Sequence, residues 1–251
     1  MIKRKIKTLV NIIRIRLKEK TYEGRMKYLL FKKNSDRLLI VFSAFPPSNL
    51  RLYNYVKGFA SIDVDRLYIN DNFGYKGSYY LYENGTTYPF DLTNGLINKI
   101  VSGGGYKYIY TTGTSKGGTA AIIFGLIFNA HDIFAGACQY NLGTYLNKEA
   151  HRKILISMMG SASETNVHLL DEYMPQLIER YHHSNSVIHL IYSKKEKEKT
   201  YEEEIVDLVE QLKKYDIQCV QKIENFTNHN DVGRYFLPYV QDFFINTNTN
   251  G

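Results

Sequence analysis

The 251-residue sequence has few of the features that would assign it to several broad classes of protein. It contains only two cysteines, Cys138 and Cys219, and both stand in apolar, strand-like runs without metal-ligand spacing. We therefore expect reduced core cysteines and no metal site. No apolar run approaches the ~18 residues of a membrane-spanning helix. Charges interrupt the apolar residues at the N-terminus, so no cleavable signal is recognisable. These absences predict a cytoplasmic protein.

Nucleic-acid and nucleotide binding are also poorly supported. The net charge is +7, but residues 1–33 hold 12 basic and two acidic residues, a charge of +10, so the remainder carries −3. A near-neutral body argues against an extended nucleic-acid surface. The sequence contains no G-x-x-x-x-G-K-[ST] loop. The glycines at 103–105 precede a strand pattern, whereas a phosphate-binding loop follows a strand, so they are typical of the end of a helix.

The basic N-terminus has a helical pattern. Apolar residues at positions 2, 6, 9, 13 and 17 fall on one stripe with lysines and arginines around it, which predicts a basic amphipathic helix within residues 1–24. Two interpretations stay open. The helix attaches to an anionic membrane surface, at the inner face of the cell membrane, or it packs on the domain with a solvated basic face.

Strand and helix patterns alternate over residues 25–246, which predicts one α/β domain with a mostly parallel central sheet and helices on both faces. The length suits a single domain with a substantial core. The predicted strands are residues 26–33, 37–42, 64–70, 108–112, 133–138, 187–192 and 217–224. The predicted helices include residues 50–59, 92–101, 201–214 and 232–245.

Finer expectations follow from the same patterns. Residues 26–33 and 37–42 are predicted to pair antiparallel through a short turn, and residues 79–82 and 86–88 to form a small hairpin. Residues 148–181 read as two helices of a cap inserted at about 147–184. The asparagine-rich residues 247–251 are predicted to be a disordered tail.

One motif indicates covalent catalysis. A β-branched and aromatic run leads into Gly113-Thr-Ser-Lys-Gly117, and a helical run of small residues follows at once. This is G-x-S-x-G in strand–turn–helix context, the nucleophile elbow of the α/β-hydrolase fold. The glycines leave room for a strained turn that exposes Ser115, and the backbone N–H of Lys116 would face a developing oxyanion. The alternative is a structural turn serine.

The order nucleophile, acid, histidine then suggests the partners. Of seven histidines, His229 lies in a polar loop beyond the last predicted strand, where the general base belongs; otherwise it is a surface histidine. The acid should follow the preceding strand, which favours Glu196. Glu198 and Asp231 are the alternatives, and the charge run around Glu196 also fits a solvated surface.

A second oxyanion donor is expected from the loop after residues 37–42, through the N–H of Ala44 or Phe45. The prolines that follow at 46 and 47 have no N–H to donate.

These motifs resemble the XcbB/CpsF family of capsular polysaccharide biosynthesis proteins, and the plan is similar to that of accessory Sec proteins that O-acetylate adhesin glycans. The resemblance is carried by residues 38–45 (LLIVFSAF), 71–74 (DNFG) with 77–81 (GSYYL), 113–118 (GTSKGG), 139–146 (QYNLGTYL) and 229–232 (HNDV). It implies an α/β-hydrolase fold that acts on a surface glycan at the cytoplasmic side. Within these motifs, Asp71, Gln139 and Tyr145 are the expected substrate contacts.

Two functions stay open. The first is a serine-dependent acyltransferase or esterase that acts on a capsular polysaccharide or related glycan or glycolipid precursor. It needs no cofactor beyond an acyl donor such as acetyl-CoA. The second is a non-catalytic assembly protein that keeps the fold and sits with capsule glycosyltransferases at the membrane.

Overall fold

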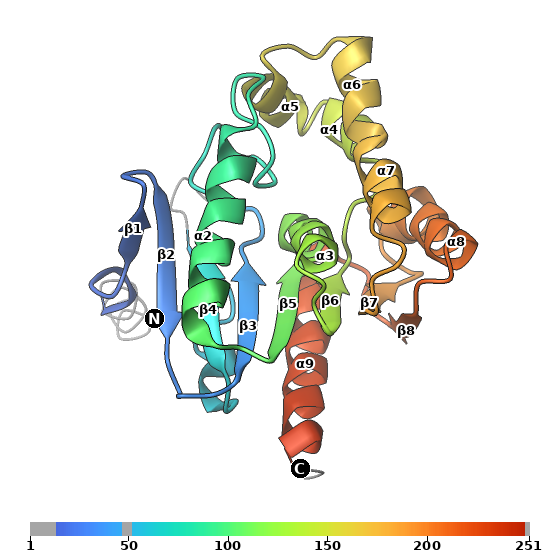
Figure 1. Ribbon diagram of the computed structural model, residues 1–251. Helices are drawn as coiled ribbons and strands as arrows, with labels where there is room; N and C mark the ends of the chain where they lie inside the picture. The colour runs from blue at the N-terminus through green and yellow to red at the C-terminus, as the bar shows by residue number, and fades with distance from the viewer. Residues whose placement is uncertain (1–13, 47–51, 249–251) are drawn as a thin grey trace, which may run out of the picture.

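The computed structural model describes residues 14–46 and 52–248, in which eight strands form one sheet of order β1-β2-β4-β3-β5-β6-β7-β8 (Figure 1). The six strands from β4 to β8 in this order run parallel, and β1 and β2 join antiparallel at one edge. The predicted mostly parallel sheet is confirmed. The strands are β1 (Lys20–Tyr22), β2 (Met26–Phe31), β3 (Arg37–Phe42), β4 (Asp65–Ile69), β5 (Tyr108–Thr114), β6 (Asp132–Gly136), β7 (Val187–Ser193) and β8 (Cys219–Glu224).

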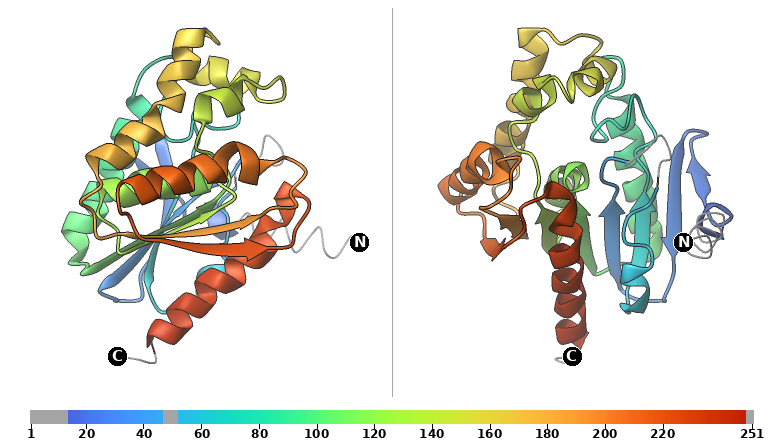
Figure 2. Two further views of the ribbon diagram at one scale, coloured as in Figure 1. Left: turned by 90° about the vertical axis from the view of Figure 1, so that its right-hand side faces the viewer. Right: turned by 180° about the vertical axis from the view of Figure 1, so that it is seen from behind.

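Helices cover both faces of the sheet, as predicted, and each face has its own apolar core (Figure 2). The alternation of side chains along a strand divides β3 between the two cores. Its Ile40 and Phe42 belong to one core, and Leu39 belongs to the other. The first core is closed by α2 (Tyr88–Gly104), α3 (Lys116–Ile127), the π-helical turn η2 (Tyr201–Ile205) and α8 (Val206–Lys214). The second is closed by the short helix η1 (Gly58–Ser61) and by α9 (Val232–Asn248).

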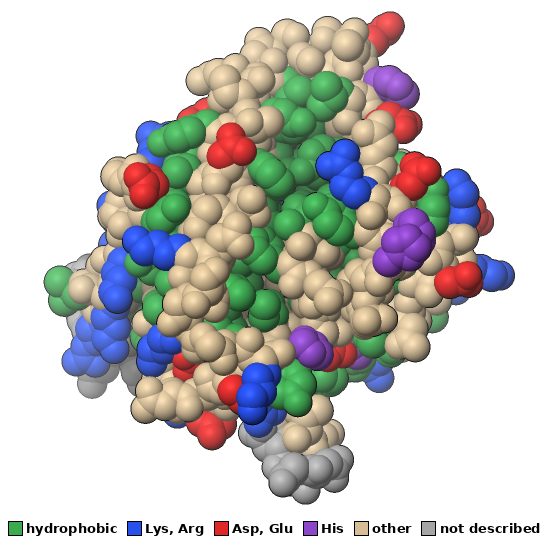
Figure 3. Space-filling view, in the orientation of Figure 1, with side chains coloured by type: hydrophobic (Ala, Val, Ile, Leu, Met, Phe, Trp, Pro, Cys, Tyr) green, Lys and Arg blue, Asp and Glu red, His purple; other side chains and the backbone are tan. Residues whose placement is uncertain are grey.

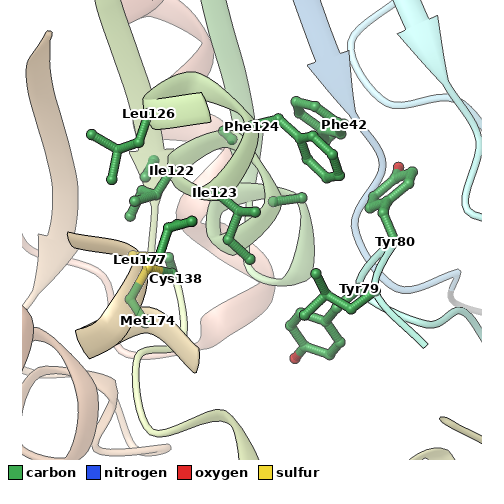
Figure 4. Close-up of a cluster of buried hydrophobic side chains, with 14 of the residues drawn as sticks. Phe42, Tyr79, Tyr80, Ile122, Ile123, Phe124, Leu126, Cys138, Met174 and Leu177 are labelled. Atoms are coloured by element: carbon green, nitrogen blue, oxygen red, sulfur yellow. The ribbon is translucent and has the colours of Figure 1, made fainter. Parts of the chain in front are cut away.

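The central helix α3 is apolar on every side because it is enclosed on every side. Phe124 stacks on Phe42 of β3 with ring centroids 5.3 Å apart, and Met174 and Leu177 lie on its other flank (Figure 4). A Cβ built on Gly117 would lie 2.5 Å from the carbonyl oxygen of Phe42. Glycine is therefore required where the start of α3 meets β3.

Four short helices between β6 and β7 form a cap above the carboxyl edge of the sheet (Figures 1 and 2). They are α4 (Leu142–Asn147), α5 (Arg152–Met159), α6 (Glu164–Asp171) and α7 (Tyr173–Arg180). Residues 148–181 thus hold three helices where two were predicted. Gly160 in the left-handed region (φ 80°) ends α5. Ser163 caps α6 by accepting a hydrogen bond from Asn166 N–H, so a new helix begins there.

Hydrophobic side chains gather at the centre of the face that α2 and α7 frame (Figure 3). A surface cleft of about 330 Å³ lies in this region, where the cap meets the segment before α2. It is lined by Tyr82, Leu169, Tyr173, Gln176, Leu177 and Arg180.

Three local predictions are wrong. β2 pairs with β4 and not with β3, because β3 is buried and both of its edges hold parallel neighbours. The predicted hairpin at 79–88 is a single bridge between Glu83 and Thr86, since Tyr79 and Tyr80 adopt positive φ angles of 55° and 59° that a strand cannot accommodate. The predicted helix at 50–59 is irregular over 52–57, and η1 begins only at Gly58.

The two ends of the chain also differ from expectation. Residues 20–22 form β1, so a helix cannot extend to residue 24, and residues 1–13 of that predicted helix lie outside the described residues. α9 continues to Asn248, two residues into the predicted tail, and 249–251 are again outside. In the part of the chain that the structure describes, no helix is both long and apolar enough to cross a membrane.

Candidate active site

Ser115 occupies a strained turn between β5 and α3. Its backbone has φ 51° and ψ −126°, a conformation that is unfavourable for a residue with a side chain. The surrounding structure holds it there: Ser115 N–H donates to the Gly136 carbonyl at 2.7 Å, and its own carbonyl accepts from Gly118 N–H at 2.8 Å. A Cβ on Gly113 would lie 2.2 Å from the Gly117 carbonyl oxygen, so the turn excludes side chains at this position.

His229 and Glu196 are in contact. Nδ1 of His229 lies 2.5 Å from Oε1 of Glu196, and the Thr200 hydroxyl donates to the same oxygen at 2.7 Å. The Glu196 residue is only 5% exposed although it lies in a charge run. The two residues come from the loops after β7 and β8, whose parallel pairing brings these loops to one edge of the sheet.

The two other acids considered for this role lie elsewhere. Asp231 pairs with Arg234 at 3.3 Å, and Glu198 is exposed. Nε2 of His229 and Oε2 of Glu196 are buried and have no hydrogen-bond partner within the described residues. A buried, unpaired ring nitrogen at a cleft is a group to which a substrate or a neighbouring hydroxyl can bind.

Ser115 and His229 line one cleft of about 500 Å³. Its walls come from the loop after β3, the elbow, the cap and the start of α9. The other lining residues are Ala44, Phe45, Pro46, Asn54, Tyr55, Thr114, Tyr145, His151, Asn230, Val232 and Gly233. A cleft at the carboxyl ends of parallel strands is the usual position of a binding site in an α/β protein.

The oxyanion candidates differ from one another. Lys116 is the first residue of α3, and the N–H groups of a first helical turn favour a bound negative charge. The prediction of Ala44 as an oxyanion donor is wrong, because its N–H donates to Oδ1 of Asn54 at 2.9 Å. Phe45 N–H makes no hydrogen bond to any described residue, and Phe45 lines the cleft.

The side chain of Lys116 turns away from the cleft and forms a buried ion pair. Its Nζ lies 2.8 Å from Oδ2 of Asp71, and both side chains are 1% exposed. The Asp71 carboxylate also accepts from the N–H and hydroxyl of Ser78, at 2.7 and 2.9 Å. Lys116 Nζ further lies 4.6 Å from the centroid of the Tyr80 ring. The expected substrate contact by Asp71 is therefore wrong, because its oxygens are used inside the protein.

Gln139 needs the same correction, whereas Tyr145 does line the cleft. Gln139 is 1% exposed, its Oε1 accepts from the Tyr79 hydroxyl at 3.1 Å, and its backbone N–H donates to Thr119 Oγ1 at 2.9 Å. Tyr145 stacks on His151 with ring centroids 4.5 Å apart.

Three lining residues were not singled out from the sequence. His151 lies between the rings of Phe45 and Tyr145, and burial together with nearby lysines lowers its pKa. The Tyr55 hydroxyl shares a 3.0 Å hydrogen bond with Thr114, next to the elbow, and burial raises the pKa of Tyr55 to about 12. Asn54 binds Ala44 as described. The sequence offered no signal for them, because 50–59 read as a helix and the cap has no motif at residue 151.

Across residues 14–46 and 52–248, no three His, Cys, Asp or Glu side chains are grouped so that they could hold a metal ion. The cleft offers the hydroxyl of Ser115 and the imidazole of His229, which contacts the buried carboxylate of Glu196.

No protein-family profile matches the sequence, and no curated protein matches it. Solved structures do. The capsule O-acetyltransferase of Neisseria meningitidis serogroup A, as a histidine-to-alanine variant in complex with CoA, matches 90% of this chain and 94% of its own, with a TM-score of 0.75 and 24% identity. The Glycosylation Associate Protein complex from Streptococcus agalactiae matches 90% of this chain and 46% of that one, with a TM-score of 0.70 and 16% identity.

FphF, a fluorophosphonate-binding serine hydrolase of Staphylococcus aureus, matches 87% of this chain and 91% of its own, with a TM-score of 0.61 and 11% identity. Together with the sheet topology, these likenesses show that the chain has the α/β-hydrolase fold, as its sequence predicts. Membership of the XcbB/CpsF family stays a prediction.

Proposed function

We propose that this chain is a serine-dependent acyltransferase or esterase that acts on a capsular polysaccharide or a related surface-glycan precursor. The observation that carries the proposal is the hydrogen bond between Glu196 and His229 in the cleft that Ser115 lines. The fold shared with a capsule O-acetyltransferase supports the glycan acceptor, and the CoA bound to that protein supports acetyl-CoA as the donor.

The contact with Glu196 assigns the protons of His229. A carboxylate only accepts hydrogen bonds, so Nδ1 of His229 carries a proton and Nε2 keeps its lone pair. Nε2 then takes the proton of the Ser115 hydroxyl as Oγ attacks the acyl carbonyl. The negative Glu196 stabilises the imidazolium that forms. The N–H of Lys116 donates to the oxyanion of the tetrahedral intermediate.

The intermediate collapses in the second step. The bond between the acyl carbon and the leaving sulfur or oxygen breaks, and the proton on His229 passes to the leaving group. A hydroxyl of the acceptor sugar then attacks the acyl-enzyme, loses its proton to His229 and carries the acyl group away as an ester, while Ser115 recovers its proton. Water in place of the sugar gives an esterase.

Intact-mass analysis after incubation with acetyl-CoA tests the reaction. We expect wild-type protein to gain the mass of one acetyl group, with release of one free thiol per acetyl group transferred. Ser115→Ala should gain nothing. If folded wild-type protein neither acquires the acetyl group nor releases thiol, with or without glycan acceptors, acetyl-CoA is excluded as the donor. If it is also not acylated by p-nitrophenyl acetate, the enzyme proposal is contradicted.

The second candidate is a non-catalytic assembly protein of a capsule biosynthesis complex. The match to a glycosylation-associated complex is the observation that favours it. In that case the protein binds capsule glycosyltransferases, and Ser115→Ala leaves its cellular function intact.

A further inference from the structure

Asn54 is a polar residue of the cleft whose side-chain oxygen has a backbone partner. It stands in the irregular segment before η1, is partly buried and lines the cleft together with Ser115. Its Oδ1 accepts the backbone N–H of Ala44 at 2.9 Å. This N–H belongs to the loop after β3, from which hydrolases of this fold supply an oxyanion donor.

The contact with Ala44 fixes which way the amide faces. A backbone N–H can only donate, so the atom opposite it must be the oxygen, and the usual ambiguity between the two ends of an asparagine amide does not arise. The amino group Nδ2 is then the other end of the amide of this side chain, which lines the cleft. No hydrogen bond from this amino group to a described residue exists, so its two protons are available to a ligand.

The site of the reaction lies against the same loop. The start of α3 packs directly on the end of β3, where a Cβ on Gly117 would lie 2.5 Å from Phe42 O and 3.1 Å from Ser43 C. The loop that holds Asn54 therefore begins beside the elbow. Side-chain amides of Asn and Gln can act as oxyanion donors, and removal of one such donor lowers kcat by about 10²- to 10³-fold.

We propose that the Nδ2 amino group of Asn54 donates a hydrogen bond to the oxyanion formed on the acyl group at Ser115, opposite the N–H of Lys116. Because Ala44 N–H donates to Oδ1 of Asn54, it does not bind the oxyanion, and the amino group of Asn54 donates to the oxyanion instead. The inference rests on the proposed acyl transfer at Ser115 and names a further catalytic residue for it.

Two substitutions separate donation from simple support of the loop. Asn54→Ala removes both contacts, whereas Asn54→Asp keeps an acceptor for Ala44 N–H and removes the donor. The measurement is the rate of the acylation burst with p-nitrophenyl acetate on the alkaline plateau of the pH–rate profile. Amide hydrogen exchange of residues 42–46 reports whether the loop stays in place. Asn230→Asp, which adds the same charge to the same cleft from the loop that holds His229, measures the effect of charge.

We expect both Asn54 variants to acylate about 10²-fold more slowly or worse than wild type. Asn54→Asp should keep wild-type exchange at residues 42–46, and Asn230→Asp should lose clearly less activity. A wild-type rate in Asn54→Asp would reduce Asn54 to a support, and a wild-type rate in Asn54→Ala would remove any role. Equal losses in Asn54→Asp and Asn230→Asp would assign the effect to charge and overturn the inference.

The two proposals fail in different ways. If wild type shows a burst and the Asn54 variants do not differ from it, only the role of Asn54 is contradicted. If wild type shows no burst, acyl transfer at Ser115 is contradicted and the inference falls with it.

Discussion

The two ring nitrogens of His229 have different surroundings. Glu196 holds Nδ1 of His229, and the opposite nitrogen is left without a partner in the described structure. In the proposed mechanism, the carboxylate sets the tautomer of His229 and also compensates the charge that appears when His229 accepts a proton.

Glu196→Gln should therefore damage catalysis far more than stability. A neutral amide cannot compensate the imidazolium, and its amino end would stabilise the wrong tautomer. We expect kcat to fall by about 10²- to 10⁴-fold, with a nearly unchanged melting temperature. The matched control is Glu198→Gln, two residues away and exposed. Equal steady-state rates for the two variants would exclude Glu196 as the orienting acid.

The buried pair of Lys116 and Asp71 makes a prediction about stability. Lys116→Met leaves the Asp71 carboxylate buried without its cation, which costs about 3–5 kcal/mol of unfolding free energy. Adding Asp71→Asn removes that charge, keeps an acceptor for Ser78 and should restore most of the loss. Urea unfolding measures both.

The exposed pair of Lys107 and Asp36 provides the control. Its atoms are 3.5 Å apart and its side chains are 74% and 45% exposed, so Lys107→Met should cost roughly 0–1 kcal/mol. If Lys116→Met costs no more than this control, the pair is not structurally important.

For single residues, the sequence predicts which loop a side chain lies in better than whether its polar atoms are buried and bonded inside the protein. The contact of Glu196 with His229, and the place of Ser115 in the same cleft, follow from the order of strands and loops, because parallel strands bring these loops together. Asp71 and Gln139 were assigned to the substrate because they lie in motifs. Burial depends on partners that are distant in the chain. No local sequence pattern could therefore indicate that their polar atoms make hydrogen bonds within the protein.

Among the secondary-structure elements, η2 has an acidic side chain that reaches the entrance of the cap. Oε2 of Glu204 accepts the N–H groups of Tyr140 and Asn141, each at 2.8 Å. Burial raises the pKa of Glu204 from an ordinary value of 4.5 to about 7, although the two N–H groups act in the opposite direction. The segment between β6 and α4 is thus bonded to η2 through the carboxyl group of Glu204.

This pKa predicts how stability depends on pH. A raised carboxyl pKa means that the folded protein binds the proton more tightly than the unfolded chain does. The contribution of Glu204 is therefore largest below about pH 4.5, falls as pH rises to about 7 and stays low above it. Glu204→Gln keeps an acceptor for both N–H groups and removes the titration. Relative to wild type, it should gain roughly 3 kcal/mol between about pH 4.5 and pH 8.

Unfolding free energies of both proteins, measured in urea at several pH values, test this. Glu202→Gln, two residues away and exposed, should leave the pH dependence almost unchanged. The prediction is contradicted if the difference between Glu204→Gln and wild type is the same at low and high pH.

Elements with a strong internal pattern were predictable, and elements defined by their neighbours were not. The buried run of β3 indicated a strand, but the sequence could not show that parallel neighbours occupy both of its edges. The segment 52–57 has helix-compatible residues, yet Tyr55 takes a φ of 60° with its hydroxyl bonded to Thr114, and this tertiary contact excludes a helix.

For the molecule as a whole, the basic N-terminus leaves two arrangements open, attachment to an anionic membrane surface and packing on the domain. The described part of this region already contacts the body: Ile15 packs on the second core, and Glu19 accepts from the Tyr53 hydroxyl at 2.8 Å. A truncation should therefore remove only residues 1–13. Sedimentation with anionic vesicles at low salt should pellet the full chain, and the loss of four basic residues at roughly 1 kcal/mol each should weaken binding strongly.

Salt and lipid charge serve as controls for this attachment. Binding of the full chain should weaken as salt rises, because the Debye length shrinks from ~10 Å at 0.1 M to ~3 Å at 1 M, and neutral vesicles should not bind. Equal pelleting of the full and truncated chains, or none of either, would contradict attachment through residues 1–13.

The central claim, that the cleft holds an activated Ser115, is tested most directly by a fluorophosphonate probe followed by peptide mass spectrometry. Such probes react with an activated serine and need neither the acceptor nor the donor. The account predicts one phosphonate per folded chain, attached at Ser115. Labelling should be abolished in Ser115→Ala, which should keep the wild-type melting temperature, and strongly slowed in His229→Ala, which should stay folded under the labelling conditions. Folded wild-type protein that stays unlabelled, or a label on any other residue, would contradict it.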